Sequence, residues 1–426
     1  MRILVAGINY APELTGIAKY TTEMCEYLTQ KGHEIYVLTG FPYYPFGADF
    51  SLWYSENCYG LGRFSIFCNE KINGVSVKRV NLFKPKKPST LKRIIHESSF
   101  LISAAIRVMF FLRKYDVIIC VSPPLFLGLV ACLMSKLRRV PCIFHVQDLQ
   151  PDAAVELGML KKGAFTSFLY AIERFIYDKS DYVFTISEGM RNKIIDKGIA
   201  GDKVKIFYDW ADVDTLKPMP KENSFAKMYN LDKKFVVLHA GNMGEKQDMA
   251  TILETARKMK ASESVCFLIV GRGAKRNFVE SYVKEHNLRN VLLLDVQPKS
   301  VVNEMFSSAD VSLIMQGKDV KDIVMPSKVF GPTSVERPII VGATDDCEIS
   351  KLAKLHNFGL VISPEDSAAL ETAIHKLQED CNLSETLGKN GRLFMGKERL
   401  KEKVIDQFEK FILTISNKSH EKERIQ

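Results

Sequence analysis

Short apolar runs alternate along this chain with longer segments in which apolar residues recur at helical spacing. Continuous apolar runs are typical of strands buried on both faces, and a period of about 3.6 residues is typical of amphipathic helices. The pattern predicts an α/β fold built on largely parallel sheets. The expected strands are Arg2–Gly7, Glu34–Leu38, Asp116–Val121, Pro141–His145, Asp181–Ile186, Val204–Phe207, Phe235–Leu238, Val265–Val270, Val291–Leu294, Val311–Ile314, Pro338–Val341 and Gly359–Val361.

The stretch FVVLHAGNMGEKQDM, residues 235–249, interrupts an apolar strand with Gly241 and Gly244 and resumes as a helix from Met249. A glycine turn between a strand and a helix start presents free backbone N–H groups and a positive dipole end. Lys246 adds a full positive charge to this turn. The combination suits a phosphate, but an ordinary strand-to-helix connection with a surface lysine uses the same residues. No Walker pattern or complete GxGxxG motif decides between the two.

The chain opens as a βαβ unit whose first loop lies at the carboxyl end of a strand, where open α/β sheets bind ligands. Gly16 begins the first helix there and permits close approach of a phosphate or sugar, or simply forms a cap. His145 ends another strand in the polar stretch HVQDLQPD, where a histidine can exchange a proton near neutral pH. The alternative is a structural histidine with Asp148 as a helix cap.

Residues 40–75 are expected to be irregular, and a long aromatic loop inside a compact domain is more often functional than idle. The segment Lys84–Arg93 is basic and is followed by a nearly apolar helix over Ile94–Lys114. This helix is expected to be buried at its centre. The basic flank beside aromatic residues has the composition of a surface that docks on anionic lipid.

Length and composition change this picture in three ways. A chain of 426 residues suggests two domains, and the polar, proline-marked segment Pro218–Lys234 fits a linker between them. The net charge of +9 allows for an anionic membrane, whereas no basic stripe with stacking aromatics points to nucleic acid. The nine cysteines lack a CxxC pair, and the chain has neither a signal-peptide pattern nor a long apolar span, so a cytoplasmic protein is expected.

Seven motifs occur in order along nearly the whole chain: GHE, SEGM, DWADVD, AGNMGEKQ, VGRG, VQPK and MPSKVF. On these motifs the sequence resembles the GT-B glycosyltransferases of family 4, in the branch that builds colanic-acid-type capsule or exopolysaccharide. The resemblance implies two facing Rossmann-like domains, over residues 1–190 on the acceptor side and 191–395 on the nucleotide-sugar side. Residues 396–426 would form a C-terminal helix that crosses back to the first domain, and a tail.

The resemblance also implies a reaction. A sugar would pass with retention of configuration from a UDP- or GDP-linked nucleotide sugar to a glycan acceptor, expected to be lipid-linked, in capsule, exopolysaccharide or O-antigen synthesis. No metal and no cofactor other than this co-substrate is expected, and the enzyme would be peripheral on the inner, cytoplasmic face of the membrane. The alternative is a non-catalytic GT-B module that docks on a membrane or on partner enzymes.

Site residues follow from the same resemblance, and all positions are in this sequence. The catalytic candidates are His145, Lys246 and Lys328. The donor-binding candidates are Gly16, Gly241, Asn242, Arg272, Val296, Gln297 and Ser327. The acceptor-side candidates are Tyr10, Glu13 and Asp148.

The sequence departs from the family at two acidic positions that normally flank the PSKVF-type run. Ile323 and Gly331 stand where the family has two glutamates, the second of which binds ribose hydroxyls. Glycine and the following Pro332 disfavour helix, so a delayed helix start and a looser ribose pocket are expected. On this reasoning, Gly331→Glu would tighten nucleotide binding.

Overall fold

The computed structural model describes residues 1–425 except positions 14, 45–48, 54–66, 86–89, 110–113, 157, 159, 162, 319 and 321–326. The chain forms two compact units, each described here by itself. The first comprises Met1–Val155, Leu160–Tyr208 and Val404–Gln426, and the second is built on Asp209–Lys403. The division falls after Tyr208, later than the expected boundary at residue 190, because α7 (Glu188–Asp196) and β8 (Val204–Ile206) complete the first sheet.

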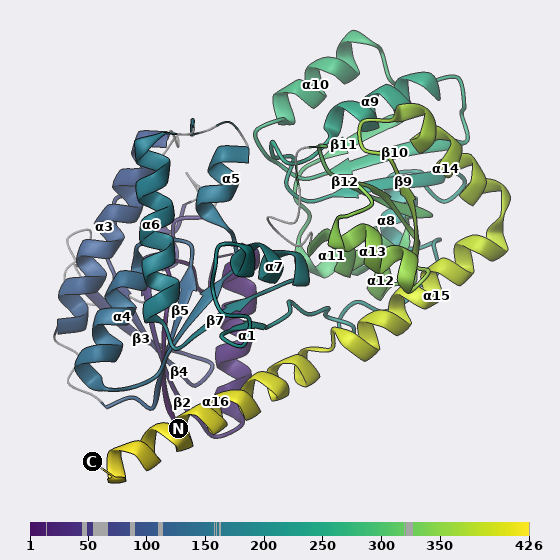
Figure 1. Ribbon diagram of the computed structural model, residues 1–426. Coiled ribbons are helices and arrows are strands. Elements are labelled where there is room, and N and C mark those ends of the chain that lie inside the picture. The colour runs from purple at the N-terminus through teal and green to yellow at the C-terminus, as the bar shows by residue number, and fades with distance from the viewer. Residues whose placement is uncertain are drawn as a thin grey trace. The chain divides into compact units, whose positions relative to one another are not determined.

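The first unit contains an eight-stranded sheet in the order β3-β4-β2-β1-β5-β6-β7-β8. All neighbours are parallel except β3 and β4. Its other strands are β1 (Arg2–Ala6), β2 (Glu34–Gly40), β3 (Phe67–Ile72), β4 (Val75–Val80), β5 (Val117–Ser122), β6 (Cys142–Val146) and β7 (Tyr182–Thr185). Apart from the C-terminal helix, its other helices are α1 (Gly16–Gln30), α3 (Thr90–Met109), α4 (Leu127–Arg138), α5 (Gln150–Glu156) and α6 (Ala164–Lys179). Figure 1 shows α3, α4 and α6 on one side of this unit, and α4 contacts both of the others.

Residues 67–80 form a hairpin, so the expectation of an irregular segment over residues 40–75 is wrong for this part. Asn73 and Gly74 have φ angles of 46° and 89°, as in the tight turns that match the twist of paired strands. An Asn-Gly pair between two alternating runs is itself a hairpin signal that the sequence carried.

The C-terminal helix α16 (Lys401–Ile425) belongs to the first unit from Val404 onward, as the family resemblance implied. The hydroxyl of Tyr27 donates a hydrogen bond to Asp406 at 2.9 Å, and His33 Nε2 lies 2.8 Å from Glu409 Oε1. The ring of Phe408 stacks on Phe207 with centroids 4.3 Å apart. Both polar and apolar contacts therefore hold α16 to this unit.

The second unit contains a six-stranded parallel sheet in the order β11-β10-β9-β12-β13-β14. Its strands are β9 (Phe235–Ala240), β10 (Val265–Val270), β11 (Val291–Leu294), β12 (Val311–Met315), β13 (Ile339–Gly342) and β14 (Gly359–Ile362). Its helices are α8 (Ser224–Met228), α9 (Met249–Lys258), α10 (Arg276–Glu285), α11 (Lys299–Ser307), η2 (Ser327–Val329), α12 (Phe330–Ser334), α13 (Glu348–Leu355), α14 (Ser367–Glu379) and α15 (Cys381–Glu398). Every strand therefore ends at the same edge of the sheet.

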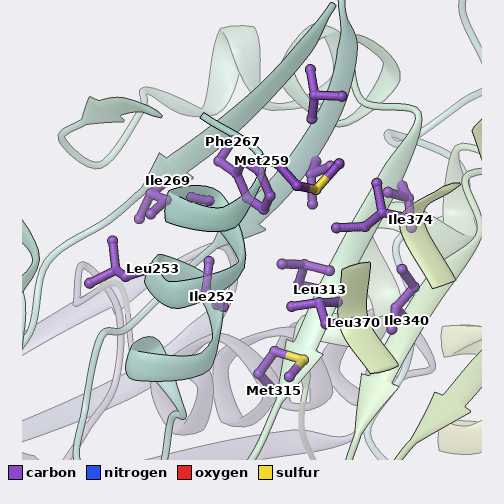
Figure 2. Close-up of a cluster of buried hydrophobic side chains, with 14 of the residues drawn as sticks. Ile252, Leu253, Met259, Phe267, Ile269, Leu313, Met315, Ile340, Leu370 and Ile374 are labelled. Carbon is purple, nitrogen blue, oxygen red and sulfur yellow. The ribbon is translucent and has the colours of Figure 1, made fainter. Parts of the chain in front are cut away.

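A large buried cluster lies between this sheet and helices α9, α10 and α14, and part of it is drawn in Figure 2. A second cluster fills the opposite face beneath α8 and α11. Phe225 of α8 is 3% exposed within that second cluster. The segment 218–234, expected to be a linker, is thus in part an integral element of the second unit.

Apolar residues are exposed on the outer side of α3, so the expectation of a helix buried at its centre is correct for one side only. Phe100 and Ala104 are buried against the unit, but Ile102 is 63% exposed. Among the described residues, no helix has the length and hydropathy needed to cross a membrane.

Candidate active site

Loops from neighbouring strands pack closely at the carboxyl edge of the second sheet. The backbone of Gly241 has a φ angle of 128°, and a Cβ atom placed on Gly271 would lie 2.0 Å from the Gly241 carbonyl oxygen. The N–H of Met243 donates to the carbonyl of Arg272 at 2.8 Å. Only glycine permits this approach, so the loop after β9 is held directly against the loop after β10.

Lys328 reaches into this loop from η2. Its Nζ donates to the carbonyl oxygen of Asn242 at 2.9 Å and to Oε1 of Gln247 at 2.5 Å. A Cβ on Gly241 would lie 2.8 Å from Lys328 Cε, so the missing side chain makes room for the lysine stem. Burial lowers the pKa of Lys328 to about 7, because a low-dielectric environment disfavours the ammonium.

The other predicted residues of this loop lie beside Lys328. Lys246 is half-buried, and its carbonyl accepts a hydrogen bond from the Gly317 N–H at 3.2 Å. Asn242 and Ser327 are exposed. The structure therefore brings together four predicted residues from two segments far apart in the sequence.

The start of α9 differs from the expectation of open N–H groups. The side chain of Asp248 caps this helix and accepts a hydrogen bond from Thr251 N–H at 3.1 Å. A carboxylate at a helix N-terminus opposes the positive end of the dipole. Positive charge at this edge is therefore supplied by lysine side chains more than by the helix.

The next two loops carry the remaining donor-side candidates. Arg272 forms a salt bridge with Asp295 at 3.0 Å, and this hydrogen-bonded pairing raises the pKa of Arg272 and lowers that of Asp295. The side chain of Val296 is 62% exposed, and Gln297 Nε2 donates to the carbonyl of Asp295 at 2.8 Å. The charge of Arg272 is thus already balanced by a carboxylate in this structure.

In the first unit, His145 lies near the end of β6 and is 4% exposed. Its Nε2 is buried without a hydrogen-bond partner among the described residues, and its ring packs 5.3 Å from that of Phe207. Burial lowers the pKa of His145 to about 3. Burial thus favours the neutral imidazole, which argues against the expected proton exchange near neutral pH.

Two acceptor-side candidates, Tyr10 and Glu13, are buried within the first unit. Tyr10 is completely buried, so its side chain offers no surface to an acceptor. Glu13 is 5% exposed, and its carboxylate accepts hydrogen bonds from the backbone N–H groups of Tyr43 and Tyr44 at 2.9 and 2.8 Å. It also accepts from Asn9 Nδ2 at 3.0 Å. Burial raises the pKa of Glu13, while these hydrogen bonds act in the opposite direction. Glu13 therefore fastens two loops together and is not available for acceptor contact.

Gly16 and Asp148 remain accessible in the first unit. Gly16 is the first residue of α1, capped by Thr15, and a Cβ placed on it would meet nothing within 4 Å. Asp148 is half-buried just before α5. Of the candidates in this unit, these two are therefore the ones that a donor or acceptor could still reach.

The expectation of a delayed helix start at Gly331 is wrong. A turn of 3₁₀ helix begins at Ser327 and α12 follows at Phe330, so the helix is not delayed; Pro332 lies within the first turn, where proline is tolerated. A Cβ on Gly331 would lie 2.3 Å from the ring of Phe306. A side chain at position 331 would point at the ring of Phe306, so a glutamate there cannot reach a ribose unless Phe306 moves.

Sequence reasoning missed two residues that organise the glycine loop. Gln247 is the second acceptor for Lys328 Nζ, and Lys275 Nζ donates to the carbonyl of Gln247 at 3.0 Å. Their signal was weak, because a glutamine and a lysine near a turn are ordinary surface residues. Among the described residues, no group of three or more His, Cys, Asp or Glu side chains is placed to hold a metal ion.

Two domain families match the chain in order. The family described as "Glycosyl transferase 4-like domain" matches residues 15–210, and "Glycosyl transferases group 1" matches residues 220–394. With two Rossmann-like units and a cation-lined strand edge, the chain is a GT-B protein. It belongs to the family 4 glycosyltransferases, in the exopolysaccharide branch.

Two curated relatives and a solved structure resemble the chain over much of its length. It is 34% identical over 387 residues to "Putative colanic acid biosynthesis glycosyl transferase WcaI" of Escherichia coli (strain K12), covering 88% of this chain and 92% of that protein. It is 24% identical over 269 residues to "Probable glycosyltransferase WbjE" of Pseudomonas aeruginosa, covering 63% and 67% of the two chains. The fold is also that of Anabaena Alr3699/HepE, solved with UDP, with a TM-score of 0.70 and 12% identity over 97% of this chain and 100% of that one.

Proposed function

We propose that this protein is a retaining, metal-independent glycosyltransferase that uses a UDP- or GDP-linked sugar as donor. The proposed acceptor is a lipid-linked glycan in capsule, exopolysaccharide or O-antigen synthesis. The observation that carries the proposal is the half-buried ammonium of Lys328 beside Gly241, at the strand edge where α/β sheets bind ligands. The proposal is supported by the UDP and UDP-glucose complexes of HepE and by the colanic acid enzyme named above.

In the proposed reaction, the bond between the sugar C1 and the donor phosphate oxygen breaks. A bond forms on the same face between C1 and an acceptor hydroxyl oxygen, and the hydroxyl proton passes to the leaving diphosphate. Negative charge grows on the diphosphate as the bond breaks. Lys328 and Lys246 would stabilise that charge more in the transition state than in the ground state.

The first test is binding of nucleoside diphosphates to the full chain. We expect UDP or GDP to raise the melting temperature, because a ligand that binds only the folded state stabilises it. Isothermal titration of both nucleotides, followed by transfer from the matching nucleotide sugars to lipid-extracted acceptors, would identify the donor. A protein that binds neither nucleotide nor any nucleotide sugar would instead support the non-catalytic scaffold.

We further propose that the enzyme works as a peripheral protein on an anionic membrane. The supporting feature is the apolar face of α3, α4 and α6, which is made of large, exposed apolar side chains on three adjoining helices. Its members are Ile94, Ile95, Ile102, Ile106, Leu133, Leu137, Phe165, Phe168 and Phe175, each at least 41% exposed. Lys92, Arg93, Lys136 and Arg139 are exposed on the same helices or at their ends, and α4 contains no acidic residue. Exposed apolar side chains with cations on the same helices match the chemistry of an anionic lipid surface, although α3 and α6 also carry Glu97 and Asp178.

The triple variant Ile102→Asp, Leu137→Asp, Phe168→Asp should lose at least tenfold in binding to phosphatidylglycerol vesicles, measured by co-sedimentation. A charge in the acyl boundary and the loss of buried apolar area both oppose docking. Leu355→Asp with Leu393→Asp, on exposed leucines of the second unit, is the matched control and should sediment like wild type.

A second variant tests the electrostatic part of the membrane proposal. Neutralising Lys84, Lys86, Lys87, Lys92 and Arg93 should weaken the binding and reduce its sensitivity to salt, since each basic residue near the surface contributes about 1 kcal/mol. Lys86 and Lys87 lie outside the described residues. Equal sedimentation of wild type and both variant sets would remove the membrane proposal.

A further inference from the structure

Gln247 holds the side chain of Lys328 through a hydrogen bond between two segments that lie 81 positions apart in the sequence. The distance from Lys328 Nζ to Gln247 Oε1 is 2.5 Å, and the second acceptor is the Asn242 carbonyl at 2.9 Å. Both acceptors are neutral oxygens. Within the part of the chain that the structure describes, Lys328 makes no ion pair with a carboxylate.

The backbone of Gln247 is itself fixed from several directions. Its N–H donates to the Gly244 carbonyl at 3.0 Å, and its carbonyl accepts from Lys275 Nζ at 3.0 Å. It also forms an antiparallel bridge with Gln316, which follows β12. The side chain of Gln247 therefore reaches Lys328 from an anchored stretch of backbone.

We infer that Gln247 is a positioning residue, which favours the charged form of Lys328 and aims it at the donor diphosphate. This inference rests on the proposed donor site. A hydrogen bond from an amide oxygen favours an ammonium without adding negative charge. A carboxylate at the same place would also favour the ammonium, but it would cancel its charge and repel a phosphate. The neutral acceptor leaves the whole charge of Lys328 for the ligand.

Other groups near Lys328 do not replace this role. His239, at the end of β9, is completely buried, and burial together with the charge of Lys328 lowers its pKa well below the usual value. Among the described residues, the adjoining loops also carry the charged groups Glu245, Lys246, Asp248, Lys275 and Arg276, and the Arg272–Asp295 pair. The cations disfavour a second positive charge nearby, and within the described part of the chain the amide of Gln247 is the side-chain group that accepts a hydrogen bond from the Lys328 ammonium.

The direct test is the titration of Lys328 in protein labelled with ¹³C at the lysine ε-carbons, with the resonance assigned by its loss in Lys328→Met. Gln247→Leu removes one acceptor and should lower the titration midpoint by roughly one pH unit. Gln247→Glu supplies a carboxylate and should raise the midpoint by at least as much. If the midpoint is the same in wild type and both variants, Gln247 does not act through Lys328.

Nucleotide binding provides the second readout. In wild type, UDP or GDP affinity should fall as pH rises through the Lys328 midpoint, because the ammonium is lost. The fall should begin at lower pH in Gln247→Leu, whereas Gln247→Glu should bind at least tenfold more weakly across the range. Lys275→Met is the control for a merely structural role, since it loosens the loop without contacting Lys328. Removing a nearby cation cannot lower the Lys328 midpoint, so in this variant the fall in affinity should not begin at lower pH, even if affinity drops. A wild type that binds neither nucleotide refutes the proposed function, whereas the lysine titration still decides the role of Gln247.

Discussion

Lys328→Met is expected to reduce sugar transfer by roughly 30- to 150-fold. The variant removes one charge-assisted contact to the leaving diphosphate, which is worth about 2–3 kcal/mol. Methionine keeps most of the stem that packs over Gly241, so the loop should retain its shape. Lys246→Met should cost a similar factor if both cations face the diphosphate. Initial rates with saturating acceptor, measured as kcat and kcat/KM, would check both variants.

The matched control is Lys258→Met. Lys258 is exposed in the last turn of α9, where its Nζ donates to Ser367 Oγ at 2.8 Å. The substitution makes the same chemical change far along the helix from the glycine turn and should leave the rate unchanged. If Lys328→Met and Lys246→Met both turn over like wild type, the diphosphate is not held here.

Stability should move in the opposite direction to activity in Lys328→Met. Burial in the folded state lowers the pKa of Lys328 to about 7, whereas the side chain is fully charged in the unfolded chain at neutral pH. Folding at neutral pH therefore has to overcome the cost of burying this charge. The unfolded state binds more protons between pH 7 and about 10, and wild-type stability should therefore rise with pH in this window. The variant should lack this rise and melt no lower than wild type at pH 7, as scanning calorimetry would show.

Gly331→Glu is expected to destabilise the second unit by roughly 2–4 kcal/mol and to leave UDP and GDP affinity no tighter than in wild type. The new side chain would begin 2.3 Å from the Phe306 ring and would place a carboxylate among buried residues. Thermal unfolding and isothermal titration of the same preparations would give both quantities.

Gly396→Glu provides the matched substitution. This glycine lies in α15, and a Cβ there would meet nothing within 4 Å, so the variant should be neutral or slightly stabilising through helix propensity. Adding Phe306→Ala to Gly331→Glu should recover part of the lost stability by opening space. Tighter nucleotide binding by the single variant, without loss of stability, would show that the glutamate reaches the ribose and that Phe306 yields easily.

Much of the fold was predictable because strand runs, helix periods and glycine turns are local properties of the sequence. The predicted runs at Val265–Val270 and Val291–Leu294 coincide with β10 and β11. Parallel strands then place their following loops at one edge, which is why Asn242, Lys246 and Arg272 could be grouped before any contact was known. The hairpin at Asn73–Gly74 was not predicted, although an Asn-Gly pair is also a local signal.

The tertiary structure decided the direction in which side chains point and what they contact. The hydrogen bond between Lys328 and Gln247, the burial of Tyr10 and the approach of Gly331 to Phe306 all join residues brought together by packing. Residue type and spacing carry no information on these distances. The sequence by itself determined the two α/β units, the order of the motifs and a cationic glycine turn. Only the folded chain showed that Glu13 fastens two loops, that His145 is buried and that Lys328 donates to a neutral amide. Burial and hydrogen-bond geometry arise only when distant segments meet.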